Sequence, residues 1–181
     1  MARPLHLPPW HPDPVGADWI ADLEAMGARP EPAVPDVVLL EYPVRLGVRQ
    51  EQRTVELVRE FQLITLDTTS GHPGVPAQLL DFAAALYGQY GPELAAPRAE
   101  LETAYAAGDL VTTLRYPLRP ASAEQMVRYA RLMEEADAFC RDGKLISLAP
   151  DHEVHALRRW IVEEFVRQYH GHPPRPWGSR D

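Results

Sequence analysis

The hexapeptide LEYPVR at residues 40–45 recurs as LRYPLR at residues 114–119, and the rest of the chain divides into two halves around these copies. Each copy follows an apolar run and precedes a segment with helical periodicity. Each of those segments leads to an apolar tetrad, LITL at 63–66 or LISL at 145–148, which we interpret as a strand. A proline after each tetrad then opens a further helix. The pattern therefore predicts a duplicated β-α-β-α unit.

The two units together predict an α+β fold. Neither half is long enough to bury much core alone, so we expect one small mixed sheet, covered by helices, with pseudo-twofold symmetry between the halves. The divisions that we expect are a proline-rich arm with a short helix at 1–36, a single domain at 37–177 and an extended tail at 172–181. Within the domain, repeats at 37–91 and 110–171 are joined by a connecting helix at 97–107.

The positions of helices and strands follow from apolar spacing and from residues that begin or end helices. Strands are expected at 37–40 and 110–114, in addition to the two tetrads, and a polar loop is expected at 67–74. The predicted helices are 18–26, 48–62, 77–90, 97–107, a segment from Ser122 to Gly143, and 151–169 with Asp151 as N-cap.

The composition is that of an ordinary globular protein, because 45% of the 181 residues are hydrophobic and 24% are charged. No apolar run approaches the ~18 residues needed to span a bilayer, so we expect no membrane association. The first residues lack the apolar core of a signal peptide, and the single cysteine, Cys140, cannot form an internal disulfide. These features predict a cytoplasmic protein.

The charge of the chain argues against nucleic acid as a partner. The formal net charge is −8, whereas phosphate contacts require clustered Lys and Arg. The acidic residues are concentrated at 1–36 and 67–109, while the segments around the two hexapeptides, 37–66 and 110–148, are nearly balanced. The hexapeptide segments are therefore much less acidic than the two acidic stretches.

The candidate binding residues are the tyrosines and arginines of the repeated Tyr-Pro-x-Arg: Tyr42, Arg45, Tyr116 and Arg119. In one interpretation the tyrosine packs at a strand end, the proline stops the strand and the arginine covers the surface beside it. In the other, Arg45 and Arg119 face one groove and bind a carboxylate or phosphate, for which the planar guanidinium is well shaped. The acceptor is then either a metabolite or an acidic side chain of a partner. Arg45, Arg49 and Arg53 also form one basic row, since they recur every four residues.

Three further stretches carry residue types used in catalysis or metal binding, and none has the required spacing. Asp151 to His155 holds two histidines three apart, but no third ligand is marked. Cys140 lies on the apolar stripe of its predicted helix, which is typical of a small core residue. Thr68 to His72 matches neither a phosphate loop nor a nucleophile elbow. We therefore assign no catalytic residue, no metal ligand and no cofactor.

Two blocks in the second half carry a resemblance to a known family: EADAFC at 135–140, and LISLAP at 145–150 continuing through RRW at 158–160 to EFVRQ at 164–168. In these blocks the chain resembles an uncharacterised family of bacterial regulatory-type proteins that accompany anti-sigma kinases and their phosphatases. The resemblance covers about residues 37–177. It implies a role in signalling and assigns no catalytic residue.

The function that we expect is that of a non-enzymatic cytoplasmic regulator or adaptor, which acts by binding another protein. The missing catalytic constellations and the family resemblance favour this hypothesis. The alternative is a small-molecule-binding module or an enzyme whose site lies between the two repeats and uses Arg45 and Arg119. Whether the chain forms a homodimer stays open.

Overall fold

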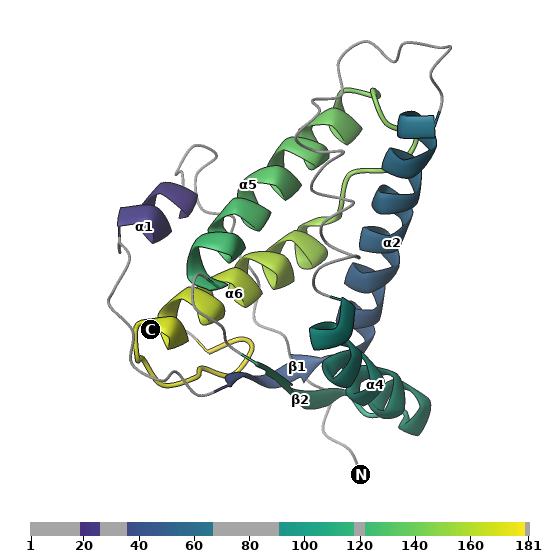
Figure 1. The fold of residues 1–181 in the computed structure, drawn as a ribbon. Coiled ribbons are helices and arrows are strands. Elements are labelled where there is room, and N and C mark those ends of the chain that lie inside the picture. Colours follow the sequence, from purple (N-terminus) through teal and green to yellow (C-terminus); the bar gives the residue numbers. More distant parts are fainter. Residues whose placement is uncertain (1–18, 26–35, 67–90, 118–121, 180–181) are drawn as a thin grey trace.

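The computed structural model describes residues 19–25, 36–66, 91–117 and 122–179 (Figure 1). In chain order the elements are α1 (Trp19–Ala25), β1 (Val37–Pro43), α2 (Val44–Leu66), α4 (Gly91–Ala107), β2 (Val111–Tyr116), α5 (Ser122–Arg141) and α6 (His152–Tyr169). This is a mixed α+β fold. The predicted polar loop at 67–74 and the predicted helix at 77–90 lie outside the described residues.

The sheet of the described residues has two antiparallel strands, β1 and β2, so the expected mixed sheet is wrong. Leu39 lies opposite Leu114, and Tyr42 lies opposite Thr112. One extra residue on β1 therefore interrupts the pairing, as in a β-bulge. Glu41 in this bulge has a φ angle of 52°, in the left-handed region that L-residues seldom adopt. The bulge turns the end of β1 so that Leu39 and Tyr42 both face the core.

The two apolar tetrads are not strands, which corrects the prediction. Residues 63–66 are the last residues of α2, and residues 145–148 form an irregular connection between α5 and α6. The reason lies in the main-chain partners of the second tetrad, because Ile146 and Ser147 donate their N–H groups to the carboxylate of Glu60 instead of to a strand. A strand followed by a helix does occur twice, as β1-α2 and β2-α5. The complete repeat and its pseudo-twofold symmetry are not confirmed.

Two predicted helices begin earlier than expected. Helix α2 begins at Val44, directly after β1, and Gly47 in its first turn lies close to the Tyr42 ring. A Cβ atom at Gly47 would lie 2.2 Å from Cε1 of Tyr42. Helix α4 begins at Gly91, so that Pro97 lies inside it. A proline inside a helix costs about 3 kcal/mol, and this helix packs against α2 and β2.

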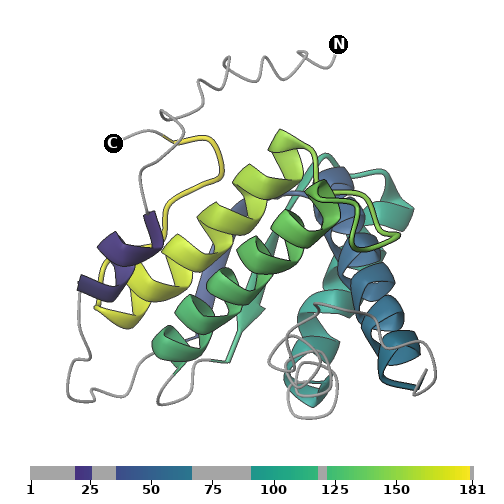
Figure 2. The same cartoon turned by 90° about the horizontal axis from the view of Figure 1, so that it is seen from above.

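Helices α5 and α6 lie side by side along one side of the sheet, and α6 is also in contact with α2 and β1 (Figures 1 and 2). Among the described residues the apolar core has three clusters. The first joins the sheet to α4 and α6, the second joins α2 to α5, and the third joins α1 to α5 and α6. None of the described helices is both long and apolar enough to cross a membrane.

The tail after α6 is attached to the sheet. Trp177 donates its main-chain N–H to the carbonyl of Leu40 over 3.0 Å, and Pro176 forms a parallel bridge with Leu40. The Trp177 ring packs edge-on against Trp160 of α6, with 5.4 Å between ring centroids. Gln168 of α6 binds both main-chain groups of Val38 with its side-chain amide. The tail and Gln168 together occupy the edge of β1 that faces away from β2.

Candidate functional site

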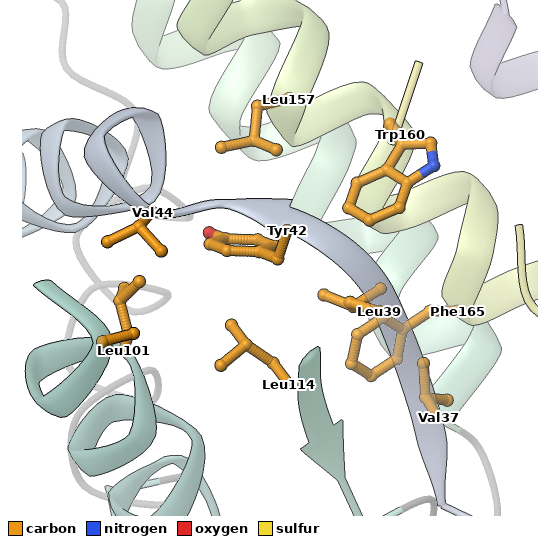
Figure 3. Close-up of a cluster of buried hydrophobic side chains, with 10 residues drawn as sticks. Val37, Leu39, Tyr42, Val44, Leu101, Leu114, Leu157, Trp160 and Phe165 are labelled. Carbon is orange, nitrogen blue, oxygen red and sulfur yellow. The ribbon is translucent and has the colours of Figure 1, made fainter. Parts of the chain in front are cut away.

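Of the four candidate binding residues, Tyr42 lies in the core and Tyr116 is partly buried against it. Tyr42 is buried in the middle of the apolar cluster that joins the sheet to α4 and α6 (Figure 3). Its ring packs against Trp160, with 6.3 Å between ring centroids. Tyr116 packs edge-on against Phe165 at 5.3 Å. Burial raises the pKa of both phenols above the ordinary tyrosine value. Both tyrosine side chains are therefore used in packing within the described structure.

The two arginines of the hexapeptides are not brought together by the described structure. Arg45 is exposed in the first turn of α2. Arg119 lies outside the described residues. A groove that uses both guanidinium groups therefore stays a prediction.

The other two arginines of the basic row bind the connection between α5 and α6. Arg49 pairs with Asp151, the N-cap of α6, and lies 3.3 Å from Glu153 in the first turn. Arg53 donates to the main-chain carbonyl of Leu148 and forms an ion pair of 2.9 Å with Asp137. The sequence showed the row of arginines, but their partners lie some hundred residues away and could not be assigned from it.

Glu60 holds the same connection from the next turns of α2. Its carboxylate accepts hydrogen bonds from the main-chain N–H groups of Ile146 and Ser147, the latter over 2.9 Å. Leu145 is buried against α2 and α5. Between these attachments, Ile146 and Leu148 are 93% and 83% exposed. We call residues 145–149 the presented loop, because its main chain is fixed while two large apolar side chains stand in solvent.

A buried ionic cluster lies beneath the presented loop, between α2, α5 and α6. Arg158 and Asp137 are 1% and 0% exposed and pair with each other, and Arg53 shares the Asp137 carboxylate. Glu134 contacts His155 at 2.7 Å and Arg158 at 3.2 Å. Buried carboxylates and guanidinium groups that share partners fix the relative position of their helices, since each charge is costly without its partner.

The pKa values of Arg158 and Glu134 favour their charged forms. Burial lowers the pKa of Arg158, but the Asp137 and Glu134 carboxylates outweigh it, so that the pKa lies above the ordinary arginine value. Burial raises the pKa of Glu134, and the hydrogen bond and charge of His155, with the charge of Arg158, bring it below the ordinary glutamate value. These ions therefore act as structural partners of one another at neutral pH.

Cys140 lies at the edge of the cluster, with its Sγ atom 3.7 Å from Nη2 of Arg53. Burial raises the pKa of its thiol more than Arg53 lowers it. The thiol is therefore protonated at neutral pH, which suits a packed core residue. Among the described residues no group of three or more His, Cys, Asp or Glu side chains has the arrangement of a metal site.

Comparison with known protein families, with characterised proteins and with solved structures found no match. The geometry of the chain itself is therefore the basis for a functional proposal.

Proposed function

We propose that this chain is a regulatory or adaptor protein that binds another protein through the presented loop. The observation that supports this proposal is the exposure of Ile146 and Leu148, 93% and 83%, on a main chain that α2 holds in place. Isoleucine and leucine are among the residues most often buried, and a contiguous exposed apolar surface is a feature of interaction sites.

The fixed main chain favours binding. A flexible loop loses conformational freedom when a partner orders it, which subtracts from the affinity. In the presented loop that ordering has already occurred, since Glu60, Arg53 and the buried Leu145 hold it to the body. Two neighbouring apolar side chains on a preorganised segment have the character of interface anchors. Leu63, three residues beyond Glu60 on α2, is also an exposed apolar residue.

A regulatory role in the cytoplasm, as implied by the resemblance to proteins that accompany anti-sigma kinases, is part of the same proposal. A partner protein from such a system would have to offer an apolar recess for Ile146 and Leu148. The alternative, a small-molecule site or enzyme that uses Arg45 and Arg119, stays a prediction. Replacing both arginines by methionine should abolish ligand binding if that alternative is correct.

The proposal is tested by affinity capture of the full-length tagged protein from its native host at low salt, followed by mass spectrometry of everything retained. The test variant carries Ile146→Asp and Leu148→Asp, which place charges where apolar contact is needed. The control is Val55→Asp, because Val55 is an exposed apolar residue on the opposite side of α2 from Glu60.

The expected result is a protein partner that is retained by the wild type and by Val55→Asp and lost by the double variant. Retention of the same protein by all three would show that the presented loop is not the contact. Retention of a small molecule without any protein would contradict the proposal and favour the alternative.

A further inference from the structure

One edge of β2 carries main-chain groups that point away from β1. Val38 lies opposite Arg115 and directs its N–H and C=O groups to Gln168, away from β2. Facing residues in an antiparallel ladder alternate between hydrogen-bonded and non-hydrogen-bonded pairs. Val38 and Arg115 are therefore a non-hydrogen-bonded pair, and the main-chain groups of Arg115 point to the other edge of β2.

The main-chain groups at the start of β2 follow the same alternation in direction. The carbonyl of Leu110 points toward β1, where it accepts the N–H of Val44 over 3.1 Å. The direction of the main-chain N–H and C=O groups alternates along a strand, so those of Val111, Thr113 and Arg115 point away from β1. None of the described residues forms a hydrogen bond with the outward main-chain groups of these three. An edge of this kind can pair with a strand from another chain.

The side chains beside the open edge are suited to contact with a protein. Leu110 and Val111 are exposed large apolar residues, and so is Tyr105 in the last turn of α4. Thr112 and Thr113 are good strand formers. Pro117 follows the strand and limits the length of any pairing, since it has no N–H to donate.

Two charges indicate which strand would pair there. Arg115 and Asp109 are both exposed, and neither side chain has an ion pair or hydrogen bond with a described residue. If two copies of β2 run antiparallel about a twofold axis at Thr112, the Arg115 side chain of each copy lies beside the Asp109 side chain of the other. Asp109 precedes β2 by two residues and donates its N–H to the carbonyl of Ala104, so this contact is one between side chains. The same register places Val111 opposite Thr113, and both of these direct their main-chain groups outward. The charges and the directions of the main-chain groups therefore both fit the β2 strand of a second copy of this chain.

We propose that the chain forms a homodimer in which the β2 strands of two copies pair antiparallel about Thr112, so that the two sheets become one continuous sheet. The presented loop is attached to α2, so the dimer contact and the loop use different residues. A small two-stranded sheet gains hydrogen bonds and covered apolar surface from this pairing. Reciprocal Arg115 and Asp109 contacts fix the register.

The first test is the mass of the full-length protein in solution, measured by sedimentation over a range of concentrations. Arg115→Asp places two acids opposite each other, and Asp109→Arg places two bases opposite each other. Each single variant should raise the dissociation constant by on the order of tenfold or more. The variant with both changes restores opposite charges and should return close to the wild type. Arg128→Asp is the control, because Arg128 is an exposed arginine on α5, away from β2.

Hydrogen exchange identifies the surface that is used. The amides of Val111, Thr113 and Arg115 should exchange roughly tenfold or more slowly at concentrations where the dimer forms than in dilute solution. Three results would overturn the proposal: a monomer at every concentration, a dimer in which these amides are not slowed, or a double charge variant that associates no better than the single ones.

Discussion

Arg158 of α6 and Asp137 of α5 form an ion pair from which solvent is almost completely excluded. Arg53 of α2 contributes a second guanidinium to the same carboxylate, at 2.9 Å. One side chain of α5 thus links the three helices that carry the presented loop. The exposed apolar surface that we propose as a binding site therefore depends on a charge that has no contact with solvent.

Replacing Asp137 by Asn should strongly destabilise the fold, because it leaves the buried charge of Arg158 without its main partner. We expect the free energy of unfolding to fall by roughly 3–5 kcal/mol, the range typical of breaking one side of a buried pair. Urea unfolding at neutral pH measures the change. Glu24→Gln is the control, since Glu24 pairs with Arg131 at the surface and its loss should change little. Equal effects of the two variants would contradict the structural role of Asp137.

Stability should also fall in acid through Glu134. Its pKa in the folded protein lies below the ordinary value of 4.5, because of His155 and Arg158. A group with a lowered folded pKa stabilises the fold above its unfolded pKa and loses that contribution as the pH falls through the folded value. The free energy of unfolding should therefore decline below about pH 4.5, and Glu134→Gln should show a smaller decline. Urea unfolding at several pH values distinguishes the two slopes, and parallel curves would refute the prediction.

The order of the presented loop should depend on Glu60. Glu60→Gln weakens the hydrogen bonds to the amides of Ile146 and Ser147, since bonds to a charged acceptor are about twice as strong as neutral ones. We expect both amides to exchange roughly tenfold faster with solvent. The matched control is Glu56→Gln, one turn earlier and exposed. If the amides of the two variants exchanged alike, Glu60 would not be the residue that holds the loop.

The close approach of Gly47 to Tyr42 predicts that Gly47→Ala destabilises the protein, although alanine is the better helix former. The added methyl group meets the tyrosine ring, and the cost of such overpacking is typically about 1–3 kcal/mol. Tyr42→Leu removes the ring atoms concerned. A double-mutant cycle measured by thermal unfolding should therefore show that Gly47→Ala costs less in the Tyr42→Leu background. Additive effects would mean that the cost has another origin.

Many helix ends were predictable because they depend on residues next to each other in the chain. Asp151 caps α6 by accepting the N–H groups of Glu153 and Val154, at 3.1 and 3.0 Å. Gly108 follows α4 with a φ angle of 78°, and Gly143 follows α5 with 68°. The buried strand residues Val37, Leu39 and Leu114 were also visible as apolar runs.

The tetrads show where local patterns fail. LITL and LISL have the same apolar character, yet the first ends a helix and the second holds Ile146 in solvent. An apolar run of four residues is compatible with either state, and the surroundings select one. For the second tetrad those surroundings include Glu60, which lies more than eighty residues earlier. Its carboxylate accepts the main-chain hydrogen bonds that a neighbouring strand would otherwise accept.

The α+β class, most helix limits and the buried strand residues of this protein could be predicted from the sequence alone, because capping, glycine conformation and apolar periodicity act within a few positions. The pairing of Arg53 with Asp137, the exposure of Ile146 and Leu148, and the β2 edge that no described residue pairs with required the folded chain. Their physical origin is the placement of distant charges and main-chain groups, which either find a partner across the fold or remain available to another molecule.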